Sequence, residues 1–378
     1  MPPISFLIKP ASGCCNMRCK YCFYADEQDN REIRSYGMMS KETMHAIVDK
    51  GLAFAERECT FAFQGGEPTL IGIDFFRDLI EYVAAQPNPR KLKFHFAIQT
   101  NGYVIDDEWA QFLAENHFLV GVSLDGTKEI HDRYRLDAAG KGTYNRVMEA
   151  IRLLKKYQVD YNILTVVTAA TTRNSQKIYN FFKKNGMGYQ QYIECLDPIG
   201  EMPGGHEYSL TPEKYEVFLK GIFDAWYLDR KNGPYVYNRY FENLMMLLNG
   251  QTPESCNMRG TCGRQWVIEA DGSTYPCDFY ALDEWLLGNI TTDSFEQMEK
   301  RQEELGFVRW SRQIHEDCRS CQWYELCRGG CRRNREPVTE NSSGKNYFCS
   351  AYQGFFEYAY PRLWEIYQKT MREMYYQK

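Results

Sequence analysis

The feature that most constrains the fold is a regular alternation of β-rich and helical segments through the first half of the chain. Such alternation predicts a parallel sheet whose crossovers are right-handed. Six strand–helix units are too few to close an eight-stranded barrel, so we expect an α/β fold with an open, partial (β/α)6 TIM-type barrel. Its site should lie at the C-terminal ends of the strands. The expected strands are residues 4–8, 60–63, 92–98, 118–124, 161–167 and 189–193, and the expected helices are 40–56, 74–85, 107–116, 143–157 and 175–185.

The second half of the chain differs in composition. Eight of the fourteen cysteines follow residue 250, in a region where we expect short strands and frequent turns. A predicted helix over 211–230 ends at a Lys-Asn-Gly-Pro break, which suggests a first domain at 1–235 and a second, cysteine-rich domain at 236–378. In the second domain we expect a short bridging helix at 240–248, a small hairpin at 266–276 and an aromatic-rich helix at 355–375.

Charge and hydropathy argue against several classes of protein. The net charge is −5, which gives no support for a nucleic-acid partner. The first ten residues lack the basic and apolar regions of a signal peptide, and no apolar run approaches the roughly 18 residues that a membrane span requires. We therefore expect a cytoplasmic protein with no nucleic acid and no membrane among its partners. In that compartment cysteines stay reduced, so metal or iron–sulfur ligation explains them better than disulfides do.

Three cysteines near the N-terminus have a spacing typical of iron–sulfur ligation. Cys15, Cys19 and Cys22 form C-x3-C-x2-C directly after the first expected strand. Three thiolates can hold three corners of a [4Fe–4S] cube, which leaves the fourth iron open, as a catalytic metal requires. On spacing alone, half of a zinc site is an even alternative.

Eight later cysteines fall into two runs with the spacings C-x5-C-x14-C and C-x2-C-x5-C-x3-C-x17-C. Their number suffices for two fully ligated four-iron cubes, and it also suffices for two zinc sites. The eight are Cys256, Cys262, Cys277, Cys318, Cys321, Cys327, Cys331 and Cys349.

Polar residues follow several expected strands, at the edge where a partial barrel places its site. The second strand ends in Gln-Gly-Gly-Glu-Pro, whose glycines let a ligand approach the backbone and whose Glu67 adds an acceptor. Ser123 ends the fourth strand, and Arg135 follows it with a guanidinium suited to a carboxylate. Asp278 comes directly after Cys277, so it lies beside a candidate cluster ligand. The alternative for each of these residues is an ordinary role in a turn or loop.

Together these motifs resemble the radical S-adenosylmethionine (radical SAM) superfamily with a SPASM extension. The resemblance implies three [4Fe–4S] clusters and one SAM, which binds the open iron of the cluster held by the N-terminal cysteines. It implies that the auxiliary cysteines interleave, with Cys256, Cys262, Cys277 and Cys331 on the first cluster and Cys318, Cys321, Cys327 and Cys349 on the second. The residues that it implies for SAM are Tyr21, Gly66, Glu67, Ser123, Arg135 and Leu196.

Over essentially its full length the chain resembles the anaerobic sulfatase-maturating enzymes. The features that carry this narrower resemblance are Ile8-Lys9-Pro10, Gln64, the spacing of the cluster cysteines and the run Cys277-Asp278-Phe279-Tyr280. The family oxidises a Cys or Ser of a sulfatase to Cα-formylglycine. The resemblance implies that a 5′-deoxyadenosyl radical removes a Cβ hydrogen while Asp278 acts as general base. It also implies two partners, an unfolded or nascent sulfatase polypeptide and an electron donor such as flavodoxin or ferredoxin.

Two other functions remain open at this point. A radical SAM/SPASM maturase that makes a thioether, a carbon–carbon crosslink or an epimer in a peptide can share the same clusters. A non-catalytic zinc-binding interaction module is the alternative from a different class. The sequence does not separate Cys from Ser as the oxidised residue.

Overall fold

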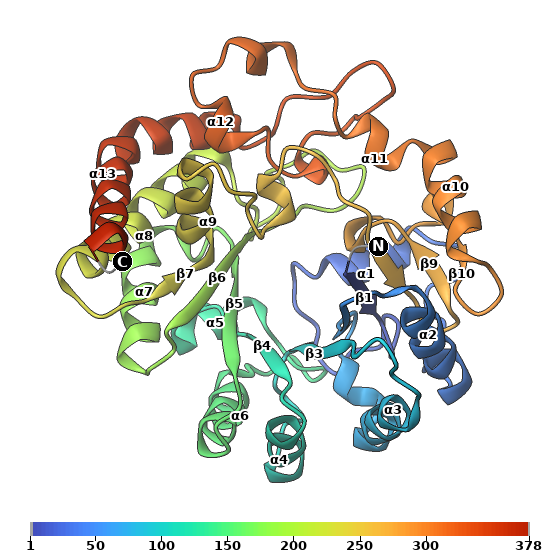
Figure 1. Cartoon of the computed structure of the whole chain (residues 1–378). Helices are drawn as coiled ribbons and strands as arrows, with labels where there is room; N and C mark the ends of the chain where they lie inside the picture. The colour runs from blue at the N-terminus through green and yellow to red at the C-terminus, as the bar shows by residue number, and fades with distance from the viewer. Residues whose placement is uncertain (1–2, 377–378) are drawn as a thin grey trace.

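The chain folds around one twisted sheet that forms an open, partial barrel (Figure 1). The computed structural model describes residues 3–376, without the side chains of 374–376. Within this part, ten strands follow the order β10-β9-β8-β1-β2-β3-β4-β5-β6-β7. All neighbours from β8 to β7 are parallel, whereas β9 is antiparallel to both β8 and β10. The strands are β1 (Ile4–Ile8), β2 (Glu58–Phe63), β3 (Lys93–Thr100), β4 (Leu119–Ser123), β5 (Tyr161–Val167), β6 (Tyr189–Glu194), β7 (Tyr237–Asn238), β8 (Trp266–Ile268), β9 (Ser273–Tyr275) and β10 (Gly288–Asn289).

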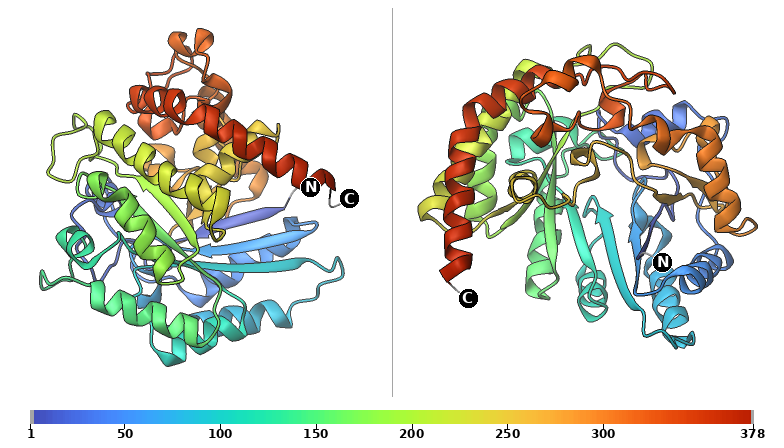
Figure 2. Two further views of the ribbon diagram at one scale, coloured as in Figure 1. Left: turned by 90° about the vertical axis from the view of Figure 1, so that its left-hand side faces the viewer. Right: turned by 45° about the horizontal axis from the view of Figure 1, so that its top comes forward.

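Helices cover the outside of the barrel, and the last third of the chain passes over its open end (Figures 1 and 2). The long terminal helix α13 packs along α8. The helices are α1 (Phe23–Asp29), α2 (Lys41–Phe54), α3 (Ile73–Ala85), α4 (Asp107–Glu115), α5 (Lys128–Tyr134), α6 (Tyr144–Lys156), α7 (Ser175–Lys184), α8 (Pro212–Asn232), α9 (Arg239–Leu248), α10 (Phe295–Leu305), α11 (Phe307–Trp310), α12 (Tyr324–Cys327) and α13 (Cys349–Tyr376). No helix in residues 3–376 combines the length and the apolar character needed to cross a membrane.

The partial barrel is confirmed, and so are all the strands and helices expected from the sequence. Their ends agree within two residues, except that α13 begins at Cys349 rather than at residue 355. The elements that were not expected from the sequence are the helices α1, α5, α10, α11 and α12 and the two-residue strands β7 and β10. Helix α10 carried a readable signal, because Ser294 and Gln297 form a capping box at its start.

Side-chain alternation along the strands separates the core from the barrel interior. Phe6, Phe61 and Phe96 are paired in register on β1, β2 and β3, with ring centroids 5.9 and 5.8 Å apart. Because successive side chains point to opposite faces, the next residues on β2 and β3, Ala62 and Ala97, face the interior. Large rings therefore build the core beneath the outer helices, and small side chains leave space inside the barrel.

The cysteine-rich part of the chain extends the same sheet. Strand β8 pairs with β1 in parallel, and β8 and β9 form the hairpin expected at 266–276. On the opposite edge, β7 pairs with β6. Strands from beyond the expected domain boundary at residue 236 therefore extend the sheet at both of its edges. The pairing of β8 with β1 also places residue 278, which follows β9, beside the loop after β1.

Candidate functional site

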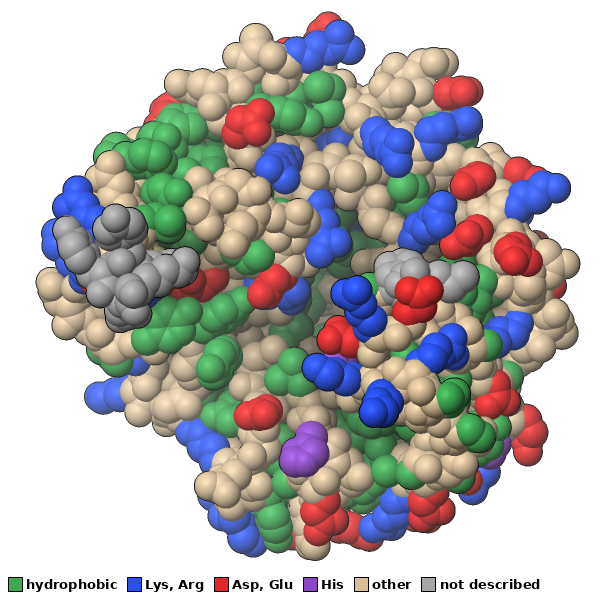
Figure 3. Space-filling model, viewed as in Figure 1, with side chains coloured by type: hydrophobic (Ala, Val, Ile, Leu, Met, Phe, Trp, Pro, Cys, Tyr) green, Lys and Arg blue, Asp and Glu red, His purple; other side chains and the backbone are tan. Residues whose placement is uncertain are grey.

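A cavity of about 450 Å³ occupies the inside of the partial barrel. This volume lies within the range of small-molecule sites. Strands β2 to β6 and the loop after β1 all contribute to its wall, and Figure 3 shows the molecular surface hollowed there. The cavity brings together every residue that the sequence analysis assigned to SAM, the N-terminal cluster or the general base: Cys15, Cys19, Cys22, Tyr21, Gly66, Glu67, Ser123, Arg135, Leu196 and Asp278.

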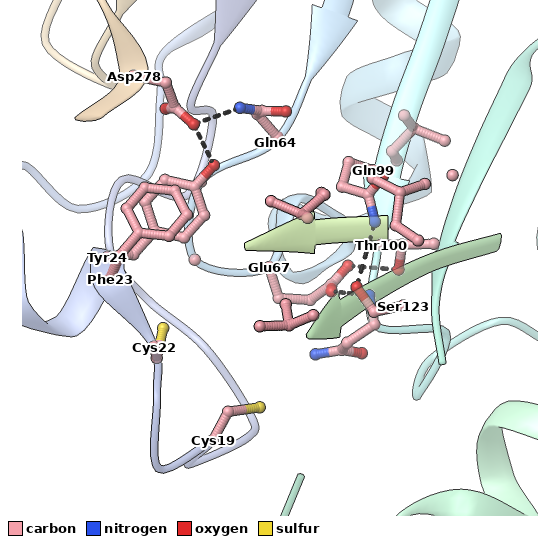
Figure 4. Close-up of a pocket in the computed structure, with 18 of the residues that line it drawn as sticks. Cys19, Cys22, Phe23, Tyr24, Gln64, Glu67, Gln99, Thr100, Ser123 and Asp278 are labelled. Atoms are coloured by element: carbon pink, nitrogen blue, oxygen red, sulfur yellow. Dashed lines mark hydrogen bonds between the residues drawn. The ribbon is translucent and has the colours of Figure 1, made fainter. Parts of the chain in front are cut away.

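The three N-terminal cysteines lie on the loop between β1 and α1 and line the cavity, and Figure 4 shows Cys19 and Cys22 there. Burial raises the pKa of Cys15 to about 11 and that of Cys19 to about 12, and repulsion between neighbouring thiolates adds to both shifts. Burial also raises the pKa of Cys22, whereas the backbone N–H groups of Tyr24 and Ala25 lower it. Three converging thiols at the edge of a ligand-sized cavity fit the donor set of an iron–sulfur cluster with one open iron.

Two glycines let the loop after β2 approach the cysteine loop. The backbone N–H of Gly66 donates to the carbonyl of Ser12, and that of Glu67 donates to the carbonyl of Cys14, both at 2.8 Å. A Cβ atom on Gly66 would lie only 2.1 Å from the Cys14 carbonyl oxygen, and Gly65 has a φ of +110°. The Gly-Gly pair is therefore required for contact between two loops of the protein, in addition to any contact with a ligand.

The carboxylate of Glu67 holds two strand ends together. It is buried and accepts hydrogen bonds from the backbone and hydroxyl groups of Thr69, from the Thr100 hydroxyl and from the backbone of Asn101. Burial raises its pKa, and these donors lower it. Four donors of the protein therefore already meet this carboxylate, and Gly66 and Glu67 both line the cavity.

Ser123 and Arg135 both line the cavity. The Ser123 hydroxyl accepts a hydrogen bond from the Gln99 amide at 3.1 Å. The Nε atom of Arg135 donates to Asp125 at 3.0 Å, and the Tyr21 hydroxyl donates to the same carboxylate. Asp125 therefore orients Arg135 through Nε, so a bound anion would meet the Nη groups.

Asp278 lies across the cavity, held by residues that precede and follow β2 in sequence (Figure 4). Its Oδ2 atom accepts hydrogen bonds from the Tyr24 hydroxyl at 2.7 Å and from the Gln64 amide at 2.6 Å. Its Oδ1 atom lies 3.4 Å from Nζ of Lys9 and has no hydrogen-bond partner among the described residues. Burial raises the pKa of Asp278, whereas Lys9 and Tyr24 lower it.

A buried charge network lies behind Asp278. Lys9 is 1% exposed, and its Nζ lies 3.1 Å from Glu27 and 3.6 Å from Glu269. Arg31 donates to Glu269 at 2.7 Å. The sequence analysis missed the roles of Glu27, Arg31 and Glu269, because they meet only when β8 joins β1. The Ile8-Lys9-Pro10 run was noticed, but nothing in the sequence showed what Lys9 contacts.

The eight later cysteines form two separate sets. Burial raises the pKa of Cys331 to about 12, and repulsion from Cys256 and Cys262 adds to the rise. Burial also raises the pKa of Cys277, and repulsion from Cys331 and Cys262 adds to that rise. Cys256, Cys262, Cys277 and Cys331, which influence one another in this way, form the first set. The second set lines a small cavity of about 30 Å³ and consists of Cys318, Cys321, Cys327 and Cys349. Burial raises the pKa of Cys327 to about 12, and repulsion from the other three thiols adds to the rise.

The thiols group as the interleaved pairing predicts, and the ligation of one cluster by each set stays a prediction. In residues 3–376, no three His, Cys, Asp or Glu side chains converge tightly enough to hold one metal ion. Each set supplies four thiols, the number of thiolates that a fully ligated four-iron cube requires, one for each iron. The donor sets present thus fit the groups that the motifs imply.

Comparisons with known proteins agree with this architecture. Residues 10–182 match the radical SAM superfamily, and residues 256–322 match the SPASM family, described as an iron-sulfur cluster-binding domain. The chain is therefore a radical SAM protein with a SPASM domain. The solved structure of native anSMEcpe with bound AdoMet and a Kp18Cys peptide superposes with a TM-score of 0.92 at 46% identity, covering 97% of this chain and 100% of that one.

Two relatives narrow the class further. A cysteine-type anaerobic sulfatase-maturating enzyme of Clostridium novyi is 50% identical, over 94% of this chain and 95% of its own length. A serine-type anaerobic sulfatase-maturating enzyme of Bacteroides thetaiotaomicron is 30% identical, over 95% and 90% respectively. The chain belongs to the family of anaerobic sulfatase-maturating enzymes.

Proposed function

We propose that this enzyme oxidises a cysteine side chain of an unfolded or nascent sulfatase to Cα-formylglycine. The observation that carries the proposal is the position of Asp278, which shares one cavity with the N-terminal cysteines and the SAM-binding wall. The higher identity to the cysteine-type relative than to the serine-type relative favours cysteine as the target. A serine substrate is the alternative within the same chemistry.

The proposed roles follow the walls of the cavity. Ser123 and Arg135 would hold the SAM carboxylate, the Gly-Gly-Glu backbone its amino group, and Tyr21 and Leu196 the rest of the molecule. When bound, SAM and the cluster on the N-terminal cysteines supply the oxidant that removes a hydrogen atom from the target Cβ, and the auxiliary clusters accept the second electron. We propose a division into domains at 1–235 and 236–378, although one sheet contains strands from both domains.

Asp278 would take the proton from the target thiol. Loss of a Cβ hydrogen atom, a thiol proton and one electron leaves a thioaldehyde, and water then replaces its sulfur to give the aldehyde and hydrogen sulfide. Tyr24 and Gln64 both donate to Oδ2, so they fix the orientation of the carboxylate. Oδ1 is buried beside Nζ of Lys9, so Oδ2 is the oxygen that would accept the proton.

We place the reaction in the cytoplasm, where reduced thiols persist and the target chain has not yet folded. All fourteen cysteines of the chain are free. A low-potential donor such as flavodoxin or ferredoxin would supply the electron that starts each turnover.

The test is anaerobic incubation of the reconstituted enzyme with SAM and a sulfatase-derived peptide that contains the target Cys. Matched peptides carry Ser or Ala at that position. We expect an aldehyde that reacts with a hydrazine from the Cys peptide and none from the Ala peptide. A crosslinked or epimerised peptide without aldehyde would instead support the peptide-maturase function.

The base is tested by Asp278→Asn, which keeps the size of the side chain and removes its basicity. We expect peptide oxidation to fall by about 10²–10⁴-fold while iron content and SAM binding are retained. Glu284→Gln is the matched control, because Glu284 is an exposed carboxylate in the same segment. Unchanged product formation in Asp278→Asn would reject the base assignment.

A further inference from the structure

Arg335 is a buried cation without an anionic partner. The residue is 3% exposed, and a guanidinium keeps its charge at any working pH. Its Nη1 atom donates to the Gln313 carbonyl at 3.0 Å, its Nη2 atom donates to the Ser311 carbonyl at 3.1 Å, and its Nε atom is buried without an acceptor. Within residues 3–373, no Asp or Glu side chain forms an ion pair with it, whereas the nearby Arg332 pairs with Glu336 at 3.0 Å.

The side chain of Arg335 lies beside segments that are linked to both auxiliary cysteine sets. The Ser311 hydroxyl accepts a hydrogen bond from the backbone N–H of Cys262, a member of the first set, at 2.9 Å. Gly329 also lies near Arg335: a Cβ atom on this glycine would lie 3.6 Å from Cδ and 3.8 Å from Nη1 of Arg335. Gly329 lies in sequence between Cys327 of the second set and the first-set residue Cys331.

Hydrogen bonds tie Gly329 to the second set. Its carbonyl accepts a hydrogen bond from the Asn346 amide at 2.9 Å, and the Asn346 carbonyl accepts one from the backbone N–H of Cys349, also at 2.9 Å.

A buried charge is retained only where another charge or a metal centre compensates it. Four thiolates around a four-iron cube give an anionic group, and two such groups would flank this one cation. We propose that Arg335 is the shared counter-charge of the two auxiliary clusters and raises the reduction potential of both. A cation stabilises the more negative, reduced state of each cluster, which favours acceptance of an electron. The inference rests on the cysteine sets proposed above.

The test measures potentials rather than turnover. In a background in which the three N-terminal cysteines are changed to Ala, only the auxiliary clusters remain, with about eight irons. Redox titration followed by electron paramagnetic resonance then compares Arg335 with Arg335→Gln and Arg335→Lys. The exposed Arg312, changed to Gln, is the control for loss of one positive charge in the same region.

We expect Arg335→Gln to lower both auxiliary potentials, each by at least the equivalent of a ten-fold change in the reduction equilibrium, about 59 mV for one electron. Arg335→Lys should lie closer to the parent, and Arg312→Gln should match it. Unchanged potentials in an Arg335→Gln protein with full iron content would overturn the proposal. So would a shift confined to one cluster.

If Arg335→Gln loses iron, the Arg335→Lys variant shows whether the charge or the packing of the side chain is responsible. If Arg335→Lys retains the clusters, the positive charge is what the site requires, and the proposal stands. If Arg335→Lys loses iron to the same extent, the side chain serves packing alone, and the proposal fails. Parent protein that holds no iron–sulfur cluster would instead refute the cysteine assignments, so the two failures are distinguishable.

Discussion

Replacement of Lys9 by Met should destabilise the protein strongly, because Lys9 is the centre of the buried charge network. Its Nζ lies 3.1, 3.4 and 3.6 Å from Glu27, Asp278 and Glu269. At an effective dielectric constant of about 20, each contact is worth roughly 5 kcal/mol, and desolvation of the charges offsets much of the sum. Loss of one member of a buried pair typically costs about 3–5 kcal/mol, which is the destabilisation that we expect.

The destabilisation should depend on pH in a defined direction. Burial already raises the pKa of Glu27 and Asp278, and loss of Lys9 removes a charge that lowers both. A carboxyl group whose pKa is higher in the folded state than in the unfolded state favours folding while it is protonated, below the unfolded pKa of about 4. This contribution is lost as pH rises through the folded pKa. The Lys9→Met variant should therefore lose more stability at pH 8 than at pH 5.

Urea unfolding of the reconstituted proteins under anaerobic conditions, followed by circular dichroism, measures the effect. Lys41→Met is the control, because Lys41 forms an exposed ion pair with Asp78 and should give little change. A Lys9→Met protein with wild-type stability at both pH values would refute the charge network as described. Equal destabilisation at pH 5 and pH 8 would show that packing of the Lys9 side chain, not its charge, is responsible.

Three further predictions concern the cluster loops and the barrel wall. Gly66→Ala should release about a third of the iron and abolish SAM cleavage, because its Cβ atom would lie 2.1 Å from the Cys14 carbonyl oxygen. An iron assay checks this prediction, and an unchanged iron content would contradict it. Replacement of all three N-terminal cysteines by Ala should reduce about twelve irons to about eight, and full zinc occupancy without iron would end the radical SAM assignment. Burial lowers the pKa of His131 to about 4, so the neutral histidine stabilises the folded protein fully above the unfolded pKa of about 6.5. The free energy of unfolding should fall between pH 6.5 and pH 4, by at most about 1.4 kcal/mol per pH unit. In urea titrations His131→Gln should lack this pH dependence.

Local sequence signals predicted the barrel and its site because they depend on neighbouring residues. Strand–helix alternation defined the elements, and the parallel topology then placed Gly66, Ser123 and the cysteine loop at one edge. These are properties of periodicity, which one sequence displays directly.

The contacts between distant segments could not be predicted in the same way. The parallel pairing of β8 with β1 joins residues about 260 positions apart, and it brings Glu269 to Lys9. Glu67 looked like a ligand for SAM, yet its carboxylate is bound by four donors of the protein itself. Both features depend on the packed loops, where several candidate partners compete for each polar group.

The central claim, oxidation at Cβ of a cysteine, is tested most directly by isotope transfer. The target Cys of the sulfatase peptide is deuterated either at Cβ only or at Cα only, and each peptide is incubated anaerobically with enzyme and SAM. We predict that deuterium from Cβ appears in 5′-deoxyadenosine together with formation of the aldehyde, and that deuterium at Cα stays in the peptide. Transfer of deuterium from Cα, or cleavage of SAM without transfer from Cβ, would contradict the account.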